Sequence, residues 1–199
     1  NCYGFPIREY DNEIPSDLTA EQIFVRSGNI GSVRIAQKVG PEKFKSFLEK
    51  IGVLSDIQFD IEEVAPQKNY NFGKCKLATA SFGHGVATTI LQLAKGYAVL
   101  SNGGYDIKPT LVDNNLEKNT KKKKLLNEGV SEQVVNALRK IVSTEEGTAK
   151  FADVEYFEIG GKTGTADQPK DGAYSEAKIN TFASILPTSN PQYVFIVML

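Results

Sequence analysis

The sequence changes character near Glu158, and this change limits the folds open to the chain. Upstream, apolar residues recur every three or four positions in several segments, the spacing that one face of an α-helix requires. Downstream, β-favouring residues and glycines dominate, and three runs are expected to be strands: 158–166, 179–187 and 193–199. Turn residues precede the last run, which favours antiparallel pairing, and its wholly apolar composition predicts a central or covered strand. The pattern predicts an α+β fold with helices packed on an antiparallel sheet.

Several helices can be placed before the sheet. Thr19 and Gln22 fit a capping box, so a helix is expected to begin there. Pro41 suits a first helical position and Ser131 an N-cap. The polar stretch 55–76 has no sustained period and is expected to be loop with at most one short strand. Further helical stripes cover 30–39, 41–51, 90–97 and 131–141.

The size and charge of the chain favour a single domain that binds its partner at a local site. With 199 residues, 41% of them hydrophobic, the chain can bury one sizeable core, and we expect residues 1–199 to form one domain or most of one. The net charge of -1 provides no basic field for nucleic acid or anionic lipid. The run Lys121–Lys124 is interpreted as a solvated loop rather than a membrane contact.

The termini and cysteines say little about function. No apolar run is long enough to span a membrane, and no signal peptide is recognisable. Because the chain starts at Asn1 without an initiator Met and stops inside an apolar run, we expect it to be a fragment. Cys2 and Cys75 are too few for a disulfide framework and are expected to be unpaired, although one bridge stays open.

Residues 162–165 suit the binding of a carboxylate next to a reactive amide. Lys162 supplies a positive charge, while Thr163 and Thr165 offer hydroxyls to the carboxylate. Gly164 has no side chain, so an acyl group can lie against the strand, where a backbone amide can face a developing oxyanion. A Lys-Thr-Gly tripeptide also arises by chance, as exposed residues on an edge strand.

Ser27-Gly28-Asn29 is the only S-x-N in the chain and falls at a break between two expected helices. Ser27 could pass a proton between a lysine and a leaving amine, and the Asn29 amide could donate to a substrate carbonyl. Taken alone, the tripeptide would be a structural turn. Together with Lys-Thr-Gly it completes two of the three motifs, S-x-x-K, S-D-N and K-T-G, of penicillin-binding proteins and class A β-lactamases, with Gly28 in the place of Asp.

The chain resembles class B penicillin-binding proteins, and septal, cell-division members most closely, over about residues 19–199. Besides the two motifs, the resemblance rests on these stretches: Ala78–Gly85, Leu91–Ala94, Asn102–Gly104, Gly160–Ala166, Tyr174-Ser175, Phe182 and Pro187–Pro191. It implies a fold of the penicillin-binding protein and serine β-lactamase type, incomplete at the N-terminus and at the C-terminus. It also implies a serine D,D-transpeptidase that crosslinks peptidoglycan stem peptides and is acylated by β-lactam antibiotics.

The resemblance also implies partners, a location and residue roles. Division proteins are the expected protein partners. The expected location is extracytoplasmic, in the periplasm, for a bacterial protein held to the inner membrane by an anchor N-terminal to this chain. By position, Ser27 would relay protons and Asn29 would orient the substrate amide. The carboxylate would be held by the lysine strand: Lys162, Thr163, Gly164 and Thr165. No S-x-x-K precedes Ser27, so the nucleophile is expected to be missing and the chain to be inactive alone.

Two other candidates are set aside. Ser175-Glu176-Ala177-Lys178 is literally S-x-x-K, but it follows the lysine strand in a polar connection near Asp171-Gly172, with no buried helix to turn its lysine into a base. His84, the lone histidine, is interpreted as a loop residue, where an aromatic residue is more usual in the family. No cofactor or metal is expected, because no ligand cluster or phosphate-binding loop is present.

Two rival functions stay open. A serine β-lactamase or D,D-carboxypeptidase would share the motifs but hand the acyl group to water, and the context Phe82–Gly85 argues against it. A non-catalytic domain that binds β-lactam or peptidoglycan, or serves as a scaffold for division proteins, would fit the missing first motif.

Overall fold

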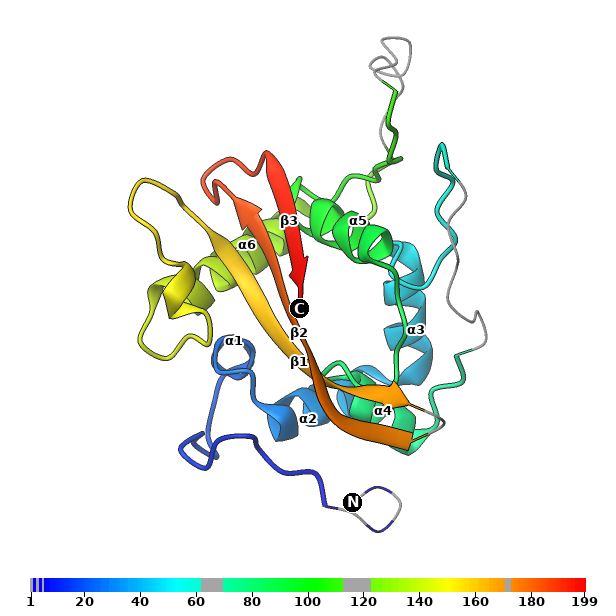
Figure 1. Ribbon diagram of the computed structural model, residues 1–199, viewed down its shortest axis with the longest axis vertical. Coiled ribbons are helices and arrows are strands. Elements are labelled where there is room, and N and C mark those ends of the chain that lie inside the picture. Colours follow the sequence, from blue (N-terminus) through cyan, green and yellow to red (C-terminus); the bar gives the residue numbers. More distant parts are fainter. Residues whose placement is uncertain (1, 3, 5, 62–69, 113–122, 171–172) are drawn as a thin grey trace.

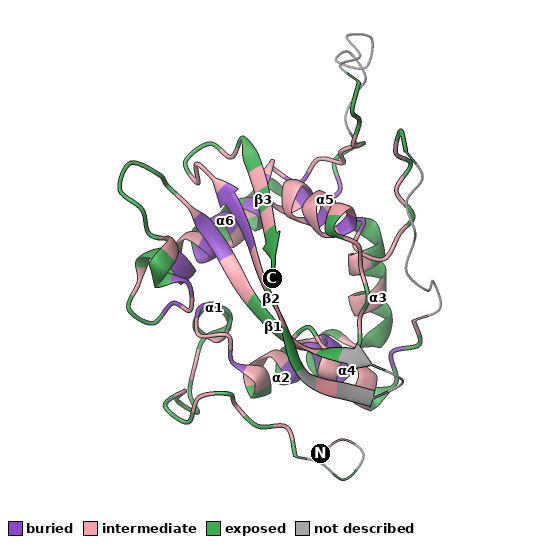
Figure 2. Ribbon diagram, in the orientation of Figure 1, coloured by how far each residue is buried: buried purple, intermediate pink, exposed green. Residues whose placement is uncertain are grey.

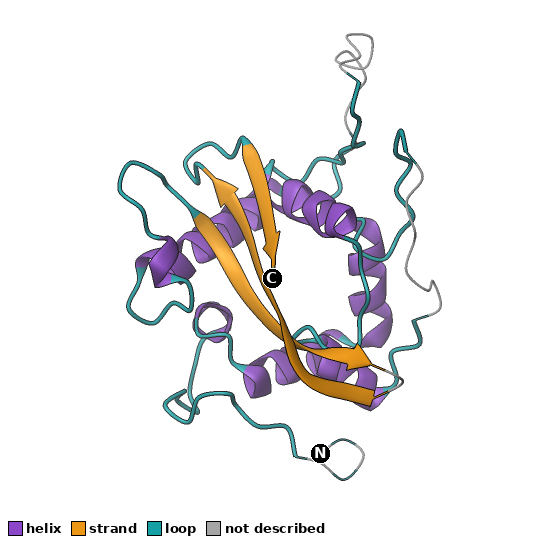
Figure 3. Ribbon diagram, viewed as in Figure 1, coloured by secondary structure: helices purple, strands orange, loops and turns teal. Residues whose placement is uncertain are grey.

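A computed structural model describes the chain except for residues 1, 3, 5, 62–69, 113–122 and 171–172. Three strands run side by side through the molecule, and the helices are arranged around them (Figures 1 and 3). The helices are α1 (Ala20–Val25), α2 (Asn29–Val39), α3 (Pro41–Lys50), α4 (Lys74–Ala80), α5 (Ile90–Ser101) and α6 (Glu128–Ser143), with a short 3-10 helix η2 (Lys150–Ala152). The expected α+β arrangement is confirmed.

The first residues of the helices show which local sequence signals predicted a helix correctly. The capping box is present, with Thr19 accepting from the amide of Gln22, and Pro41 begins α3. Helix α5 begins with a second capping box, at Thr89, that the periodicity did not predict. The expectation of loop over 55–76 is wrong at its end, because α4 begins at Lys74.

The predicted N-cap at Ser131 is wrong. Helix α6 begins one turn earlier, and Asn127 is its N-cap, accepting from the amide of Gly129. Ser131 lies inside the first turn and is buried. Its hydroxyl donates to the carbonyl oxygen of Leu100 (2.6 Å) and accepts from the amide of Gly103 (3.0 Å). Tertiary contacts, rather than a cap, therefore explain a serine at this position.

The sheet is an antiparallel meander in the order β1-β2-β3. Its strands are β1 (Gly160–Lys170), β2 (Ala173–Leu186) and β3 (Tyr193–Met198), so the first two extend further toward each other than the sequence predicted. The expectation of a central or covered last strand is met on one face of the strand only. Strand β3 forms an edge of the described sheet, and Tyr193, Phe195 and Val197 are each more than half exposed on one face (Figure 2). Val194, on the other face, packs against the core.

The main core lies between α6 and the sheet, with Leu138, Ile141 and Ile185 almost fully buried. Two glycines allow the close approach at the start of β1. A Cβ on Gly160 would lie 3.0 Å from the backbone nitrogen of Arg139 in α6, and one on Gly161 would lie 2.9 Å from the carbonyl oxygen of Ala183. Helix α6 therefore fixes the position of this strand directly.

The remaining expectations concern charges and thiols. Lys121 and Lys122 lie outside the described residues, whereas Lys124 forms an ion pair with Glu128 (3.5 Å). Both cysteines are free, and a hydrogen bond to Cys75 is the main cause that raises the pKa of the Cys2 thiol. Among the residues that the structure describes, no helix combines the length and apolar character needed to cross a membrane.

Candidate active site

Lys162 and Ser27 meet, although 135 residues separate them in the sequence. Lys162 lies on β1, and its Nζ donates to the hydroxyl oxygen of Ser27 (2.7 Å) and to the carbonyl oxygen of Thr163 (3.0 Å). Burial lowers the pKa of Lys162 to about 8, from an ordinary value of 10.5. Near neutral pH this lysine can hold a charge and can also exchange a proton with the serine in contact with it.

Ser27 occupies the turn between α1 and α2 in a left-handed backbone conformation, with φ at 59°. For a non-glycine residue, such a conformation costs about 1–3 kcal/mol, and residues strained in this way cluster at functional sites. The turn is closed by backbone bonds: the amide of Ser27 donates to the carbonyl oxygen of Phe24 (3.2 Å), and that of Gly28 to the carbonyl oxygen of Ile23 (2.8 Å). The strained residue is thus the one whose hydroxyl meets Lys162.

The N-terminal segment braces this turn. The Glu9 carboxylate accepts from the first amides of α2, those of Asn29 (2.5 Å) and Ile30 (2.9 Å), where a negative charge is favoured by the helix dipole. The Tyr10 hydroxyl donates to the carbonyl oxygen of Arg26 (2.9 Å), next to Ser27. Neither contact was predicted, because no local sequence pattern links residues so far apart.

Asn29 begins α2, and its side-chain amide donates to the carbonyl oxygen of Arg8 (3.0 Å). The structure therefore brings Ser27 and Lys162 together while the Asn29 amide is directed at the N-terminal segment. A role in orienting a substrate stays a prediction for Asn29.

Of the residues after Lys162, Thr163 is held by a hydrogen bond to the loop after α6, whereas Gly164 and Thr165 are exposed. The hydroxyls of Thr163 and Thr148 share a hydrogen bond of 2.9 Å. Further along β1, the Thr165 hydroxyl is exposed and donates to Asn180 on β2 (3.0 Å). Gly164 is also exposed, and a Cβ there would meet only Thr181, at 4.0 Å. This stretch of strand has room for a ligand beside its backbone.

Thr148 was missed by sequence reasoning. It follows Gly147 in the loop after α6, and a Cβ on Gly147 would lie 2.0 Å from the carbonyl oxygen of Ile141. The loop is therefore pressed against the helix in a way that only glycine allows. The glycine next to a threonine was the one signal that could have indicated this site residue.

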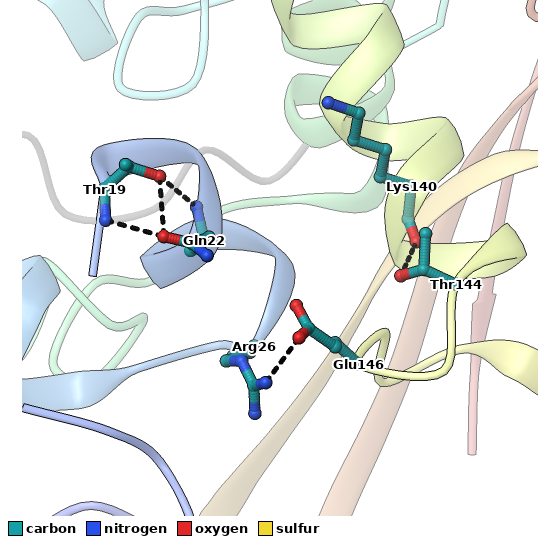
Figure 4. A network of polar contacts seen from close by, with 6 residues as sticks. All are labelled: Thr19, Gln22, Arg26, Lys140, Thr144 and Glu146. Carbon is teal, nitrogen blue, oxygen red and sulfur yellow. Dashed lines mark hydrogen bonds and ion pairs between the residues drawn. The ribbon is translucent and has the colours of Figure 1, made fainter. Parts of the chain in front are cut away.

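Two ion pairs join α1 and the turn after it to α6 and its following loop, and Figure 4 shows the one between Arg26 and Glu146. Arg26 pairs with Glu146 (2.6 Å), and Lys140 pairs with Glu21 (2.7 Å). Figure 4 also shows the Thr19–Gln22 capping box at the start of α1. At the end of α6, the Thr144 hydroxyl donates to the carbonyl oxygen of Lys140 (2.7 Å). Together the two ion pairs hold α1 and the turn that carries Ser27 against α6 and its following loop.

The literal S-x-x-K at 175–178 lies in strand β2 rather than in the polar connection that the sequence predicted. Ser175 donates to the carbonyl oxygen of Gln168 (3.0 Å), and Lys178 pairs with Asp167. Residues three apart on a strand point to opposite faces, so Ser175 and Lys178 cannot act on one group. Asp171 and Gly172, named with this connection, lie outside the described residues.

His84 lies in the loop after α4, with its ring centroid 5.4 Å from that of Phe82. Its Nδ1 atom is buried without a hydrogen-bond partner. Within the described part of the chain, no group of three or more His, Cys, Asp or Glu side chains could hold a metal ion.

Comparison with known proteins supports one family. The family model described as penicillin binding protein transpeptidase domain matches residues 3–199. A peptidoglycan D,D-transpeptidase FtsI homolog from Mesostigma viride is 32% identical, over 91% of this chain and 35% of its own length. Stage V sporulation protein D from Bacillus subtilis is 30% identical, over 87% of this chain and 29% of its own length. The chain thus spans about a third of the length of these curated relatives.

Solved structures agree in fold. The transpeptidase domain of penicillin-binding protein 3 from Burkholderia pseudomallei superposes with a TM-score of 0.80 at 25% identity, covering 92% of this chain and 56% of that one. Penicillin-binding protein 3 from Mycobacterium tuberculosis, complexed with ampicillin, gives a TM-score of 0.80 at 26% identity, covering 91% and 44%. The helices, the antiparallel sheet and their arrangement are therefore common to all three.

Proposed function

The chain belongs to the penicillin-binding protein transpeptidase domain family, and we propose that it supplies part of the active site of a serine-type peptidoglycan D,D-transpeptidase. In that reaction a serine attacks the penultimate D-alanine carbonyl of a stem peptide and expels the terminal D-alanine. The acyl group then passes to an amine of a neighbouring strand. The observation that carries the proposal is the 2.7 Å contact between the Ser27 hydroxyl and Lys162.

The two residues of this contact suit a proton relay. As Ser27 passes its own hydroxyl proton to the departing amine, Lys162, with a pKa near 8, can replace that proton on the Ser27 oxygen in the same step. Asn29 would orient the substrate amide once its own amide leaves the carbonyl oxygen of Arg8.

The strand side of the site suits the donor peptide. The positive charge of Lys162 and the hydroxyls of Thr163 and Thr165 would hold the terminal carboxylate of the donor. Gly164 leaves the backbone of β1 open for the acyl portion to lie along it. β-Lactams, which present a carboxylate beside a strained amide, would occupy the same positions.

The nucleophile is proposed to come from a Ser-x-x-Lys element outside these 199 residues, because the only such sequence in the chain lies on strand β2. The chain alone would then be inactive, since loss of the nucleophile from a serine acyl enzyme costs about a millionfold in rate. A septal role, division proteins as partners and an extracytoplasmic, membrane-anchored parent are part of the same proposal, which the FtsI-type relatives support.

Intact-mass measurements with benzylpenicillin test this function. We expect no covalent adduct on the 199-residue chain and a stable adduct of one benzylpenicillin on the full-length protein. An adduct on the 199-residue chain would contradict the assignment of the nucleophile. Failure of the full-length protein to react would favour a non-catalytic binding domain or scaffold, and rapid hydrolysis of the adduct would favour a β-lactamase or carboxypeptidase.

A further inference from the structure

Three side-chain contacts form a ring that includes the Ser27–Lys162 pair. Lys162 donates to Ser27 (2.7 Å), the hydroxyls of Thr163 and Thr148 share a hydrogen bond (2.9 Å), and Arg26 pairs with Glu146 (2.6 Å). Short pieces of backbone join each contact to the next. The members of this contact ring are Arg26, Ser27, Lys162, Thr163, Thr148 and Glu146.

We propose that Arg26 and Glu146 are positioning residues, which set the Ser27 hydroxyl against Lys162 by joining the α1–α2 turn to the loop that carries Thr148. This inference rests on the proposed function of the Ser27–Lys162 pair. Neither residue is expected to touch a substrate; both act through the neighbours to which they are bonded.

Arg26 is well placed to control Ser27. It is the C-cap of α1, its carbonyl oxygen accepts from the Tyr10 hydroxyl, and its side chain is three-quarters buried. Ser27 follows in a backbone conformation that a non-glycine residue leaves when nothing holds it. Fixing Arg26 at both its backbone and its guanidinium group therefore limits how far the Ser27 hydroxyl can move from Lys162.

Glu146 is well placed to control the loop that carries Thr148. It precedes Gly147, whose missing side chain lets the loop lie against the carbonyl oxygen of Ile141. The amide of Gly147 donates to the carbonyl oxygen of Thr144 (3.0 Å), so a backbone hydrogen bond closes this turn. A shift of Glu146 would carry Thr148 away from Thr163, the residue next to Lys162.

The structure contains a matched control for this ion pair. Lys140 and Glu21 also join α6 to α1, at 2.7 Å, and both are about half exposed. Neither residue adjoins a member of the contact ring. An effect of the Arg26–Glu146 pair that came only from fastening the two helices would be reproduced by breaking the Lys140–Glu21 pair.

The first test measures acylation of the full-length protein by benzylpenicillin. Arg26→Ala and Glu146→Ala should each lower the second-order rate constant by about tenfold, and the double variant by no more than either alone, because both break one interaction. The charge-reversed pair Arg26→Glu with Glu146→Arg should recover most of the rate. Lys140→Ala should stay within about twofold of wild type, as expected of an exposed pair.

The second test measures the pKa of Lys162 by NMR in the full-length protein and needs no catalysis. Loss of positioning lets water reach Lys162, so Arg26→Ala and Glu146→Ala should both raise its pKa toward 10.5. A purely Coulombic effect would move it in opposite directions, upward on removal of the cation and downward on removal of the carboxylate. Lys140→Ala should leave it unchanged.

Each outcome decides between the proposals. An unchanged Lys162 pKa together with unchanged acylation in both ring variants would overturn the positioning role, as would opposite pKa shifts. Rate losses no greater than the loss of folded protein, measured by circular dichroism on the same samples, would also overturn it. If the wild-type full-length protein is not acylated, the proposed function fails. The NMR measurement of the Lys162 pKa still tests whether Arg26 and Glu146 position Lys162 and Ser27.

Discussion

The two halves of strand β1 both pair with β2, in one register as far as Asp167, but they differ in what surrounds them. Residues 160–163 are buried or half-buried against α6 and the α1–α2 turn, whereas Gly164, Thr165 and Gln168 are exposed and the strand there is paired with β2 alone. The proposed chemistry lies at the boundary, where Lys162 is shielded from water and the strand becomes exposed immediately afterwards. A desolvated cation and an accessible backbone therefore occur within three residues of each other.

Lys162 and Lys178 show the same contrast on a single hairpin. Burial brings the pKa of Lys162 to about 8, while Lys178 is more than half exposed and pairs with Asp167. Lys178 is the lysine of a literal S-x-x-K, yet its strand gives it no partner serine. Environment, rather than the tripeptide or tetrapeptide itself, separates the lysine proposed to be functional from the surface one.

The largest expected effect on stability concerns the buried charge of Lys162. Its folded pKa lies below its unfolded value, so between pH 8 and 10.5 the unfolded chain binds more protons and stability should rise with pH. The expected gain is about 2–3 kcal/mol over that range. Urea unfolding of wild type and Lys162→Met should show the gain only in wild type. An equal rise of stability with pH in Lys162→Met would contradict this assignment. Lys178→Met is the control and should keep the wild-type rise.

A smaller effect should separate the two glycines of the strand. In Gly161→Ala the new Cβ would lie 2.6 Å from the Phe182 ring and 2.9 Å from the Ala183 carbonyl oxygen, and overpacking of this kind should cost about 2 kcal/mol. In Gly164→Ala the nearest atom is 4.0 Å away, so stability should hold while acylation of the full-length protein slows. Equal losses of stability would show that the two halves are packed alike.

The smallest effect should come from the exposed half. Asp167→Asn removes the partner of Lys178, which holds the pKa of Asp167 below its ordinary value. Any stability that the carboxylate contributes is present above its unfolded pKa and is lost as pH falls through the folded one. The thermal midpoint of Asp167→Asn should therefore be slightly lower at low salt and equal to wild type at high salt. If the thermal midpoint of Asp167→Asn stays below that of wild type in high salt, the Asp167–Lys178 pair is not a screened surface pair.

Local sequence signals predicted much of the fold and the motif residues. They did not predict the residues that hold the motif residues in place. The Thr19 capping box, Pro41 and the strand composition predicted elements that the structure contains. The S-x-N and K-T-G motifs indicated that Ser27 and Lys162 share a site. An apolar run shows that β3 packs against something but not on how many sides, which is why its edge position was not predicted.

The supports of the site depend on contacts between distant residues. Arg26 and Glu146 are 120 residues apart, and neither lies in a periodic or motif position. Thr148 and Thr163 meet only because Gly147 lets its loop lie on α6. Such contacts follow from the packed fold, so a single sequence carries almost no sign of them.

The central claim is that Lys162, in contact with Ser27, belongs to the acyl-transfer site and that the lysine of the literal S-x-x-K does not. The most direct measurement is the second-order rate constant for acylation of the full-length protein by benzylpenicillin in Lys162→Ala and Lys178→Ala. The account predicts a loss of at least about a hundredfold for Lys162→Ala, as for other groups that stabilise acyl transfer electrostatically. Lys178→Ala should stay within about twofold of wild type, because its ion pair is exposed. Equal losses in the two variants, or a loss confined to Lys178→Ala, would contradict the account.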